Sequence, residues 1–130
     1  MADYVIKRLE EIPDVLGDYP GEMRMATYEM GNEQVAFTHR RMPPDTGGKG
    51  SYGHHHKTQE EIYFVVSGTL TFKLAEDVVE AGPGTIVRIP PHVVRSVHNE
   101  SDEDAELVMV STRVSDPGDE VERTEGFWPA

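Results

Sequence analysis

Residues 48–68 read GKGSYGHHHKTQEEIYFVVSG, and this stretch decides how the rest of the chain is interpreted. His54 and His56 are two residues apart, so on an extended chain both imidazoles face one side while His55 faces the other. Glu61 begins the apolar run that follows and can close the same centre from a neighbouring strand. Glu60 competes for this role, but the two glutamates face opposite ways on a strand, and the position of Glu61 at the head of the run favours it.

Two imidazoles and one carboxylate suit iron, manganese, zinc, nickel or copper, and such a ligand set leaves positions open for substrate. We therefore predict a divalent transition-metal site on His54, His56 and Glu61. The alternative is a solvated pair of loop histidines, because a motif of three residues also arises by chance.

Short strand-like runs, separated by glycine and proline, extend from this stretch in both directions. A hairpin turn is expected at Gly31-Asn32 and a short helix or turn at residues 10–17. Strands are expected at residues 4–9, 23–30, 34–42, 61–67, 69–74, 78–80, 85–89, 93–97 and 107–113. Many short strands of this kind predict an all-β sandwich or barrel with a minor helical turn near the N-terminus.

Residues 114–130 read as a polar, acidic tail that ends in two aromatic residues and Pro-Ala. We expect Phe127 and Trp128 to dock on the barrel or on a partner subunit, because disordered segments rarely contain tryptophan.

The chain has 130 residues, a formal net charge of −12 and no cysteine. This length suits one domain, and the acidic charge argues against binding to nucleic acid or to anionic membranes. Without cysteine there is no disulfide, thiolate metal site or cysteine nucleophile. The first residues, MADYVIKR, contain no apolar run typical of a signal peptide, so we expect a cytoplasmic protein.

The histidine stretch resembles the first motif of the cupin superfamily, in which Gly, His-x-His, Glu and Gly follow at fixed spacing. Gly48, His54, His56, Glu61 and Gly68 match it. The second cupin motif resembles residues 84–99, GTIVRIPPHVVRSVHN, where Gly84, Pro90 and Asn99 match, His92 replaces a glycine and Arg95 replaces the histidine.

The resemblance implies a jelly-roll β-barrel over roughly residues 21–113, an N-terminal strand and turn extension over residues 1–20, and the acidic tail over residues 114–130. It also implies a homodimer. In the family, the second-motif histidine is usually the fourth metal ligand, a role that Arg95 cannot take because a guanidinium has no lone pair to donate.

Three outcomes follow from Arg95. The metal can rest on His54, His56 and Glu61 with water completing the shell, or a fourth ligand can come from His92 or His98. In the third outcome no metal binds and Arg95 pairs with Glu61. His98 is three residues from Arg95 and faces the opposite side of a regular strand, whereas His92 follows two prolines in a turn.

Arg95 can also bind a substrate carboxylate or phosphate through its paired N–H groups. Tyr63 shares the face of Glu61 and is a second candidate for binding substrate, with a core aromatic as the alternative. On the earlier strand, either His39 with Arg41, or Arg40, can line the cavity. Catalytic residues are left unassigned.

The resemblance favours a divalent-metal enzyme that acts on a small polar organic acid or a sugar-like molecule, by dioxygenation, isomerisation or a lyase reaction. A non-catalytic cupin module that binds a small ligand or a metal is the first alternative. A metal-free, epimerase-like cupin is the second. Fold alone does not choose among them.

Overall fold

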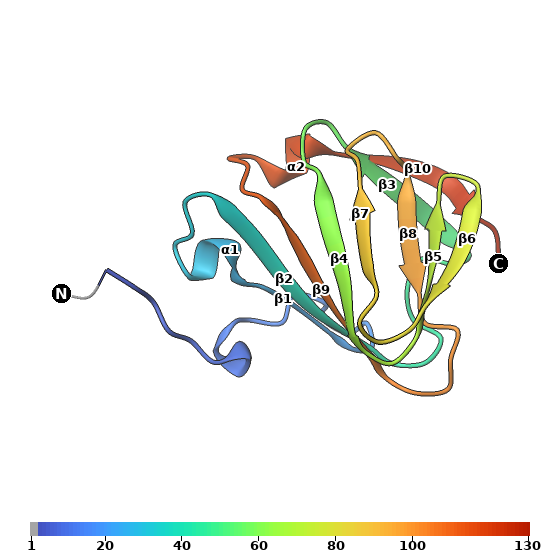
Figure 1. Ribbon diagram of the computed structural model, residues 1–130, viewed down its shortest axis with the longest axis horizontal. Coiled ribbons are helices and arrows are strands. Elements are labelled where there is room, and N and C mark those ends of the chain that lie inside the picture. The colour runs from blue at the N-terminus through green and yellow to red at the C-terminus, as the bar shows by residue number, and fades with distance from the viewer. Residues whose placement is uncertain (1–2) are drawn as a thin grey trace.

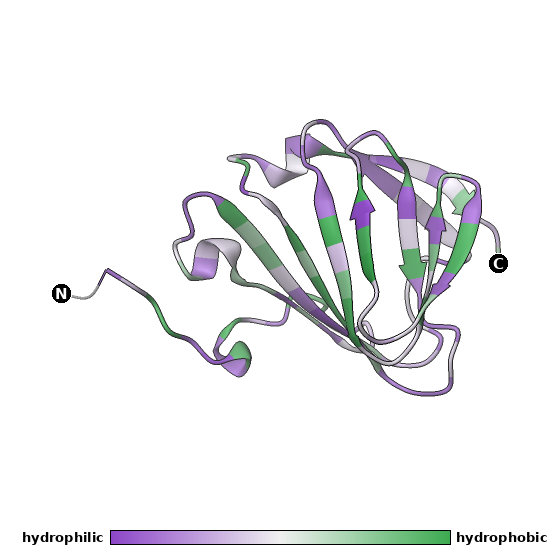
Figure 2. Ribbon diagram, viewed as in Figure 1, coloured by the Kyte–Doolittle hydropathy of each residue, from purple (hydrophilic) through white to green (hydrophobic). Residues whose placement is uncertain are grey.

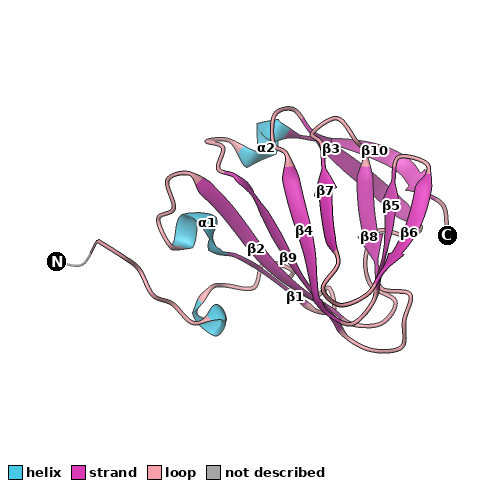
Figure 3. Cartoon of the chain, viewed as in Figure 1, coloured by secondary structure: helices cyan, strands magenta, loops and turns pink. Residues whose placement is uncertain are grey.

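Ten β-strands make up most of the regular structure in the computed structural model, which describes residues 3–130 (Figure 1, Figure 3). The elements are, in order, the 3-10 helix η1 (Leu9–Glu11), β1 (Glu22–Met25), α1 (Ala26–Glu29), β2 (Val35–Met42), β3 (Ser51–His56), β4 (Glu61–Ser67), β5 (Leu70–Leu74), β6 (Asp77–Ala81), β7 (Ile86–Ile89), β8 (Arg95–His98), β9 (Ala105–Thr112), α2 (Pro117–Glu120) and β10 (Val121–Trp128).

The strands form two antiparallel five-stranded sheets, in the orders β1-β2-β9-β4-β7 and β10-β3-β8-β5-β6. The inner faces of the two sheets pack against each other in a jelly-roll arrangement. This confirms the all-β fold class predicted from the sequence. No helix among the described residues is long and apolar enough to cross a membrane.

The core lies between the sheets and is built by strand alternation. On β4, Tyr63 and Val65 are buried, whereas Ile62, Phe64 and Val66, which alternate with them, face outward. Figure 2 shows hydrophobic residues on the central strands and hydrophilic residues in β3. The buried core cluster consists of Met42, Tyr63, Val65, Leu70, Phe72, Ala81, Ile89, Val97, Ala105 and Leu107. The polar strand β3 therefore brings its histidines to an otherwise apolar interior.

The N-terminal segment differs from its prediction. The prediction of a strand at residues 4–9 is wrong. Residues 4–8 pair with no other strand, and residues 9–11 form η1. Tyr4, Val5 and Ile6 are largely exposed, and the segment projects away from the sheets (Figure 1). Apolar alternation alone does not make a strand, since the backbone N–H and C=O groups also need a partner.

Gly31-Asn32 ends a helix and does not turn a hairpin. The expected strand at residues 23–30 stops at Met25 and continues as the single helical turn α1. Gly31 has a φ of 70°, and its N–H bonds to the carbonyl of Tyr28 while the N–H of Asn32 bonds to that of Thr27. This pattern is a Schellman cap, which uses the same Gly-Asn residues as a hairpin turn.

Residues 121–128, expected to belong to a polar tail, form β10 and pair with β3. Val121 lies opposite His56 and Arg123 lies opposite His54. Trp128 is buried and packs edge-on against His98, so the predicted docking of the terminal aromatic residue occurs on the chain's own barrel. The domain limits themselves stay a prediction. What changes is that the C-terminal residues are part of the sheet that holds the histidines.

Candidate metal centre

His54, His56 and Glu61 converge between the two sheets, at the end where β3 finishes and β4 begins. Their potential ligand atoms all lie within 4.8 Å of one another. The ligand atoms around one transition-metal ion are about 3 to 3.5 Å apart, so small side-chain rotations bring the three into range. The side chains of His56 and Glu61 are 6% and 13% exposed, which shields the centre from bulk water. The three side chains therefore lie together, as the alternation of side chains along a strand predicted.

Neighbouring residues fix the proton of the His56 ring. The side-chain N–H of Gln59 donates to the carbonyl of Thr112, which turns the Gln59 oxygen toward Nδ1 of His56 at 3.0 Å. Oε2 of Glu120 lies 3.4 Å from the same nitrogen. With two acceptors beside it, Nδ1 carries the hydrogen, and the lone pair of Nε2 faces the centre.

Nε2 of His56 is buried without a hydrogen-bond partner, although it lies 3.0 Å from Oε1 of Glu61. An imidazole lone pair and a carboxylate oxygen repel each other at this distance unless a proton or a metal ion lies between them. The donor set and this orphaned nitrogen both fit a divalent metal ion.

The other two side chains are also in the protonation states that metal binding needs. Burial, together with the positive charge of Arg95, lowers the pKa of His54 to about 4, so the ring is neutral at pH 7 and keeps a lone pair. For Glu61, burial favours the protonated acid, but a proton shared with His56 and the positive charge of Arg95 outweigh it and hold the pKa below its usual value. Glu61 is therefore a carboxylate.

Arg95 lies beside this group, in the position where the family motif has its histidine. The residue is fully buried, and its Nε is 3.8 Å from Oε1 of Glu61. Its Nη2 donates to the carbonyl of Pro90 at 3.1 Å, while Nε and Nη1 have no hydrogen-bond partner. The guanidinium thus adds a positive charge next to the carboxylate.

Tyr63 faces the same interior, one alternate position further along β4. Its hydroxyl donates to Oε1 of Glu61 at 3.2 Å. Complete burial and the nearby carboxylate raise the pKa of Tyr63 far above its usual value, so the hydroxyl stays protonated and acts as a donor. Tyr63 is both a member of the core and a contact of Glu61.

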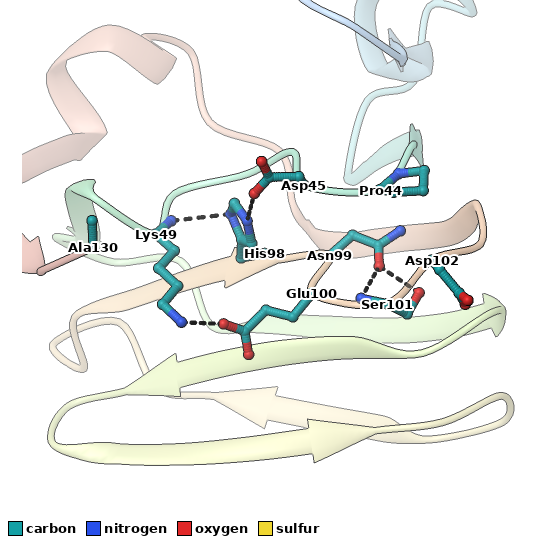
Figure 4. Close-up of a pocket in the computed structure, with 9 residues that line it drawn as sticks. All are labelled: Pro44, Asp45, Lys49, His98, Asn99, Glu100, Ser101, Asp102 and Ala130. Atoms are coloured by element: carbon teal, nitrogen blue, oxygen red, sulfur yellow. Dashed lines mark hydrogen bonds and ion pairs between the residues drawn. The ribbon is translucent and has the colours of Figure 1, made fainter.

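The structure does not bring the two alternative fourth ligands to the centre. His92 is exposed in the turn before β8 and is not part of the group. His98 faces the opposite side of β8 from Arg95, where its Nε2 lies 3.1 Å from Asp45 and its Nδ1 accepts from the backbone N–H of Lys49 (Figure 4). The parity argument that disfavoured His98 agrees with this placement.

His39 lies outside the barrel, which corrects its place among the cavity residues. Its Nε2 is 3.0 Å from Oε2 of Glu106, and it lines an apolar groove on the outer surface. Because faces alternate along β2, Arg40 shares the inner face with Thr38 and Ala36, which line the interior cavity. Nε of Arg40 is buried without a partner. Of the two options on this strand, Arg40 is the inward one.

Two residues at the centre have no signal in the sequence motif. Gln59 orients His56 from the loop before β4, and Glu120 approaches His56 from α2. Glu120 accepts hydrogen bonds from the backbone N–H groups of Thr58 and Gln59, both at 2.8 Å, and from the Thr58 hydroxyl at 2.7 Å. Glu120 is more than sixty residues from His56 along the chain, so only the folded structure shows that the two side chains lie close together.

A family model for the cupin domain matches residues 39–111, more than half of the chain. The chain belongs to the cupin family. The match contains His54, His56, Glu61 and Arg95 and ends before Glu120. A search of the curated proteins finds no match.

Similar solved structures share the cupin fold at low sequence identity. A sugar phosphate isomerase from Silicibacter pomeroyi is 18% identical, with a TM-score of 0.70 over 97% of this chain and 96% of that one. A Cupin 2 conserved barrel domain protein from Salinispora arenicola is 17% identical, with a TM-score of 0.69 over 88% and 92%. A predicted oxalate decarboxylase from Thermotoga maritima is 22% identical, with a TM-score of 0.68 over 85% and 100%. Another neighbour, from Acidithiobacillus ferrooxidans, is longer, and the chain covers 60% of it.

Proposed function

We propose that this cupin is a metal-dependent enzyme that acts on a small organic molecule, by a dioxygenase, isomerase or lyase type of reaction. The observation that carries the proposal is the lone pair of His56 Nε2, which faces the Glu61 carboxylate at 3.0 Å without a hydrogen bond. A divalent ion held there would supply Lewis-acid chemistry or activate oxygen or water.

The residues of the chain then have distinct roles. His54, His56 and Glu61 hold the ion, and Gln59 and Glu120 keep the His56 ring in the ligating tautomer. Arg95 helps to keep Glu61 ionised, and the hydroxyl of Tyr63 holds the carboxylate in place through a hydrogen bond. Direct binding of a substrate carboxylate by the free nitrogens of Arg95, and contact of Tyr63 with substrate, stay predictions.

Metal analysis by mass spectrometry, on protein purified without a nickel column, tests the proposal. We expect close to one first-row transition-metal ion per chain, and its loss in His56→Ala and Glu61→Ala. His55→Ala is the matched control, because His55 lies between the two ligands, faces the other way and pairs with Glu122 at 3.2 Å. Wild-type protein that stays metal-free after reconstitution would contradict a metalloenzyme.

One observation favours a second candidate, a metal-free acid–base enzyme of the epimerase-like kind. The 3.8 Å contact between Arg95 and Glu61 is the ion pair expected when no metal binds. Metal-free protein that keeps a stable fold would support this candidate. A metal shell that is already saturated by protein and tightly held water would instead support a non-catalytic binding module.

We also propose that two copies form a homodimer through the outer face of the sheet that contains β4. Val35, Ile62, Phe64, Val66 and Ile86 are exposed to between 37% and 65% on the strands of this sheet. The projecting N-terminal segment carries a second exposed apolar surface, next to an apolar groove. A two-fold interface would let each copy cover the exposed surfaces of the other. A cytoplasmic location stays a prediction.

A further inference from the structure

One interior cavity, of about 160 Å³, opens beside the candidate centre and reaches His56 and Glu61. Its walls come from the two sheets and from the short helices α1 and α2. Met25, Met109 and Val121 supply apolar side chains from β1, β9 and β10. Most of the surface that surrounds the cavity is apolar. A ligand that reaches the centre through this cavity must therefore leave water for an apolar environment.

The volume limits the size of that ligand. An apolar protein cavity of about 150 Å³ holds one benzene molecule, so this cavity accommodates a body of about one six-membered ring. Thr38, Gln59 and Ser111 line only part of the cavity, so a phosphorylated sugar would place some of its hydroxyl groups against methionine and valine side chains, and each hydroxyl without a partner costs free energy. The two methionines adapt their shape to a ring and contact aromatic groups favourably.

Within the described part of the chain, Arg113 is the only positively charged residue that lines the cavity. Its guanidinium lies 4.9 Å from the centre of the Tyr28 ring, and the Tyr28 hydroxyl donates to the carbonyl of Val114. Among residues 3–130, no carboxylate lies within 4 Å of the Arg113 nitrogens. A chain with a net charge of −12 thus keeps one unpaired cation at the rim.

The position of Arg113 determines which end of a ligand would face the candidate centre. Ser111 lies opposite Glu61 in the pairing of β9 with β4. Arg113 is two residues further on and lines the same cavity, about 7 Å along an extended chain. The cation and the metal ligands therefore face the cavity from its two ends. A ligand with a carboxylate at one end, an oxygen at the other and a ring between them matches this order.

We propose that the substrate is a small carboxylic acid with a ring-sized apolar body, of the hydroxybenzoate kind, and not a sugar phosphate. Its carboxylate binds Arg113, its ring packs between Met25, Met109 and Val121, and its distal oxygen points toward His56 and Glu61. This inference rests on the proposed function, because it takes the centre to be the reacting end of the cavity.

Binding of three probes, measured by calorimetry, tests the inference. We expect 4-hydroxybenzoate to bind more tightly than 4-hydroxybenzyl alcohol, which lacks the carboxylate, and more tightly than glucose 6-phosphate. Arg113→Gln should weaken 4-hydroxybenzoate about tenfold, as the loss of one charge-assisted hydrogen-bond pair predicts, and leave the alcohol unchanged. Arg113→Lys should restore part of the affinity, which a merely structural role of Arg113 would not produce.

Arg88→Gln is the matched control, because Arg88 is an exposed arginine on β7 that pairs with Glu60 at 3.3 Å. Tighter binding of glucose 6-phosphate, no binding of 4-hydroxybenzoate, or equal affinity of the wild type and Arg113→Gln for 4-hydroxybenzoate would overturn the inference. Metal content is measured on the same samples. Metal-free protein with Arg113-dependent binding refutes the proposed function alone, whereas metal-loaded protein that fails to bind the acid refutes this inference alone.

Discussion

Replacing Glu120 by alanine removes the carboxylate of the C-terminal segment that accepts hydrogen bonds from Thr58 and Gln59 in the loop between β3 and β4. The carboxylate is 6% exposed and accepts two backbone hydrogen bonds and one hydroxyl hydrogen bond. Alanine leaves the N–H of Gln59 buried without an acceptor and removes two part-buried hydrogen bonds that Thr58 makes to the charge. A buried donor without a partner costs about 1 to 3 kcal/mol and a hydrogen bond to a charged group contributes about 1.5 to 3 kcal/mol, so we expect Glu120→Ala to lower the free energy of unfolding by about 3 to 5 kcal/mol.

Glu120→Gln separates the charge from the hydrogen bonds. One amide oxygen can still accept both backbone N–H groups, while the amide N–H₂ can donate to the Thr58 hydroxyl. Burial would raise the pKa of Glu120, but the hydrogen bonds from Thr58 and Gln59 and the nearby His56 lower it to about 2. Because one pKa unit corresponds to about 1.4 kcal/mol, Glu120→Gln should cost about 3 to 4 kcal/mol at pH 7.

The pH dependence has a defined sign. The folded pKa of about 2 lies below the ordinary glutamate pKa of 4.5, so the charge stabilises the fold fully above pH 4.5 and stops doing so as the pH falls toward 2. The difference between wild type and Glu120→Gln should therefore shrink over this range. Urea unfolding with a chelator present measures it without a contribution from metal release.

Glu122→Gln is the control, because Glu122 lies two residues further along, is 54% exposed and contacts only His55 among the ion pairs. We expect it to change stability by less than about 0.5 kcal/mol. If Glu120→Ala lowers stability by less than about 1 kcal/mol, or no more than Glu122→Gln does, the assignment of Glu120 as the anchor of this loop is wrong.

Three further changes test the fold and the assembly. Gly31→Ala forces a Cβ onto a residue with a φ of 70°, so we expect a loss of about 1 kcal/mol in urea unfolding, which an unchanged midpoint would contradict. Gly53→Ala places a Cβ against the ring of Phe127, and we expect a loss of about 1 to 3 kcal/mol in the free energy of unfolding, measured by thermal unfolding. An unchanged melting temperature would show that β10 moves freely away from β3. Phe64→Lys puts a charge on the outer sheet face, and light scattering should find monomers where the wild type is dimeric; a dimer in both proteins would exclude this face as the interface.

The local part of the centre could be predicted because a strand repeats every two residues. That period alone places His54 and His56 on one face, separates Glu60 from Glu61, and sets His98 apart from Arg95. The run of β-branched and aromatic residues that ends before Gly68 predicted a strand over residues 61–67, as the structure has it. Where two residues are neighbours on one strand, their relative direction follows from the sequence without knowledge of the fold.

The remaining part of the centre depends on contacts between distant segments. β10 is an edge strand, and edge strands commonly carry charges that prevent further pairing. Glu122, Arg123 and Glu125 supply such charges, so the segment resembled a solvated tail. Nothing near His56 in the sequence indicates that Glu120 approaches it. Gly31-Asn32 shows a different limit, because a helix cap and a hairpin turn use the same two residues and only the hydrogen bonds distinguish them.

The exchange of a histidine for Arg95 alters the charge of the centre as well as its ligand count. Glu61 and Glu120 contribute two negative charges near His56, and Arg95 contributes one positive charge 3.8 Å from Glu61. With a neutral histidine the group would be charged −2 without an ion and neutral with a divalent ion. With Arg95 it is charged −1 without the ion and +1 with it, so the loaded centre attracts an anion. The free nitrogens of Arg95 and the unpaired cation of Arg113 add to this field from the two ends of the site. If the centre holds a divalent ion, as proposed, the exchange therefore favours negatively charged ligands, because it replaces a neutral ligand with a buried cation.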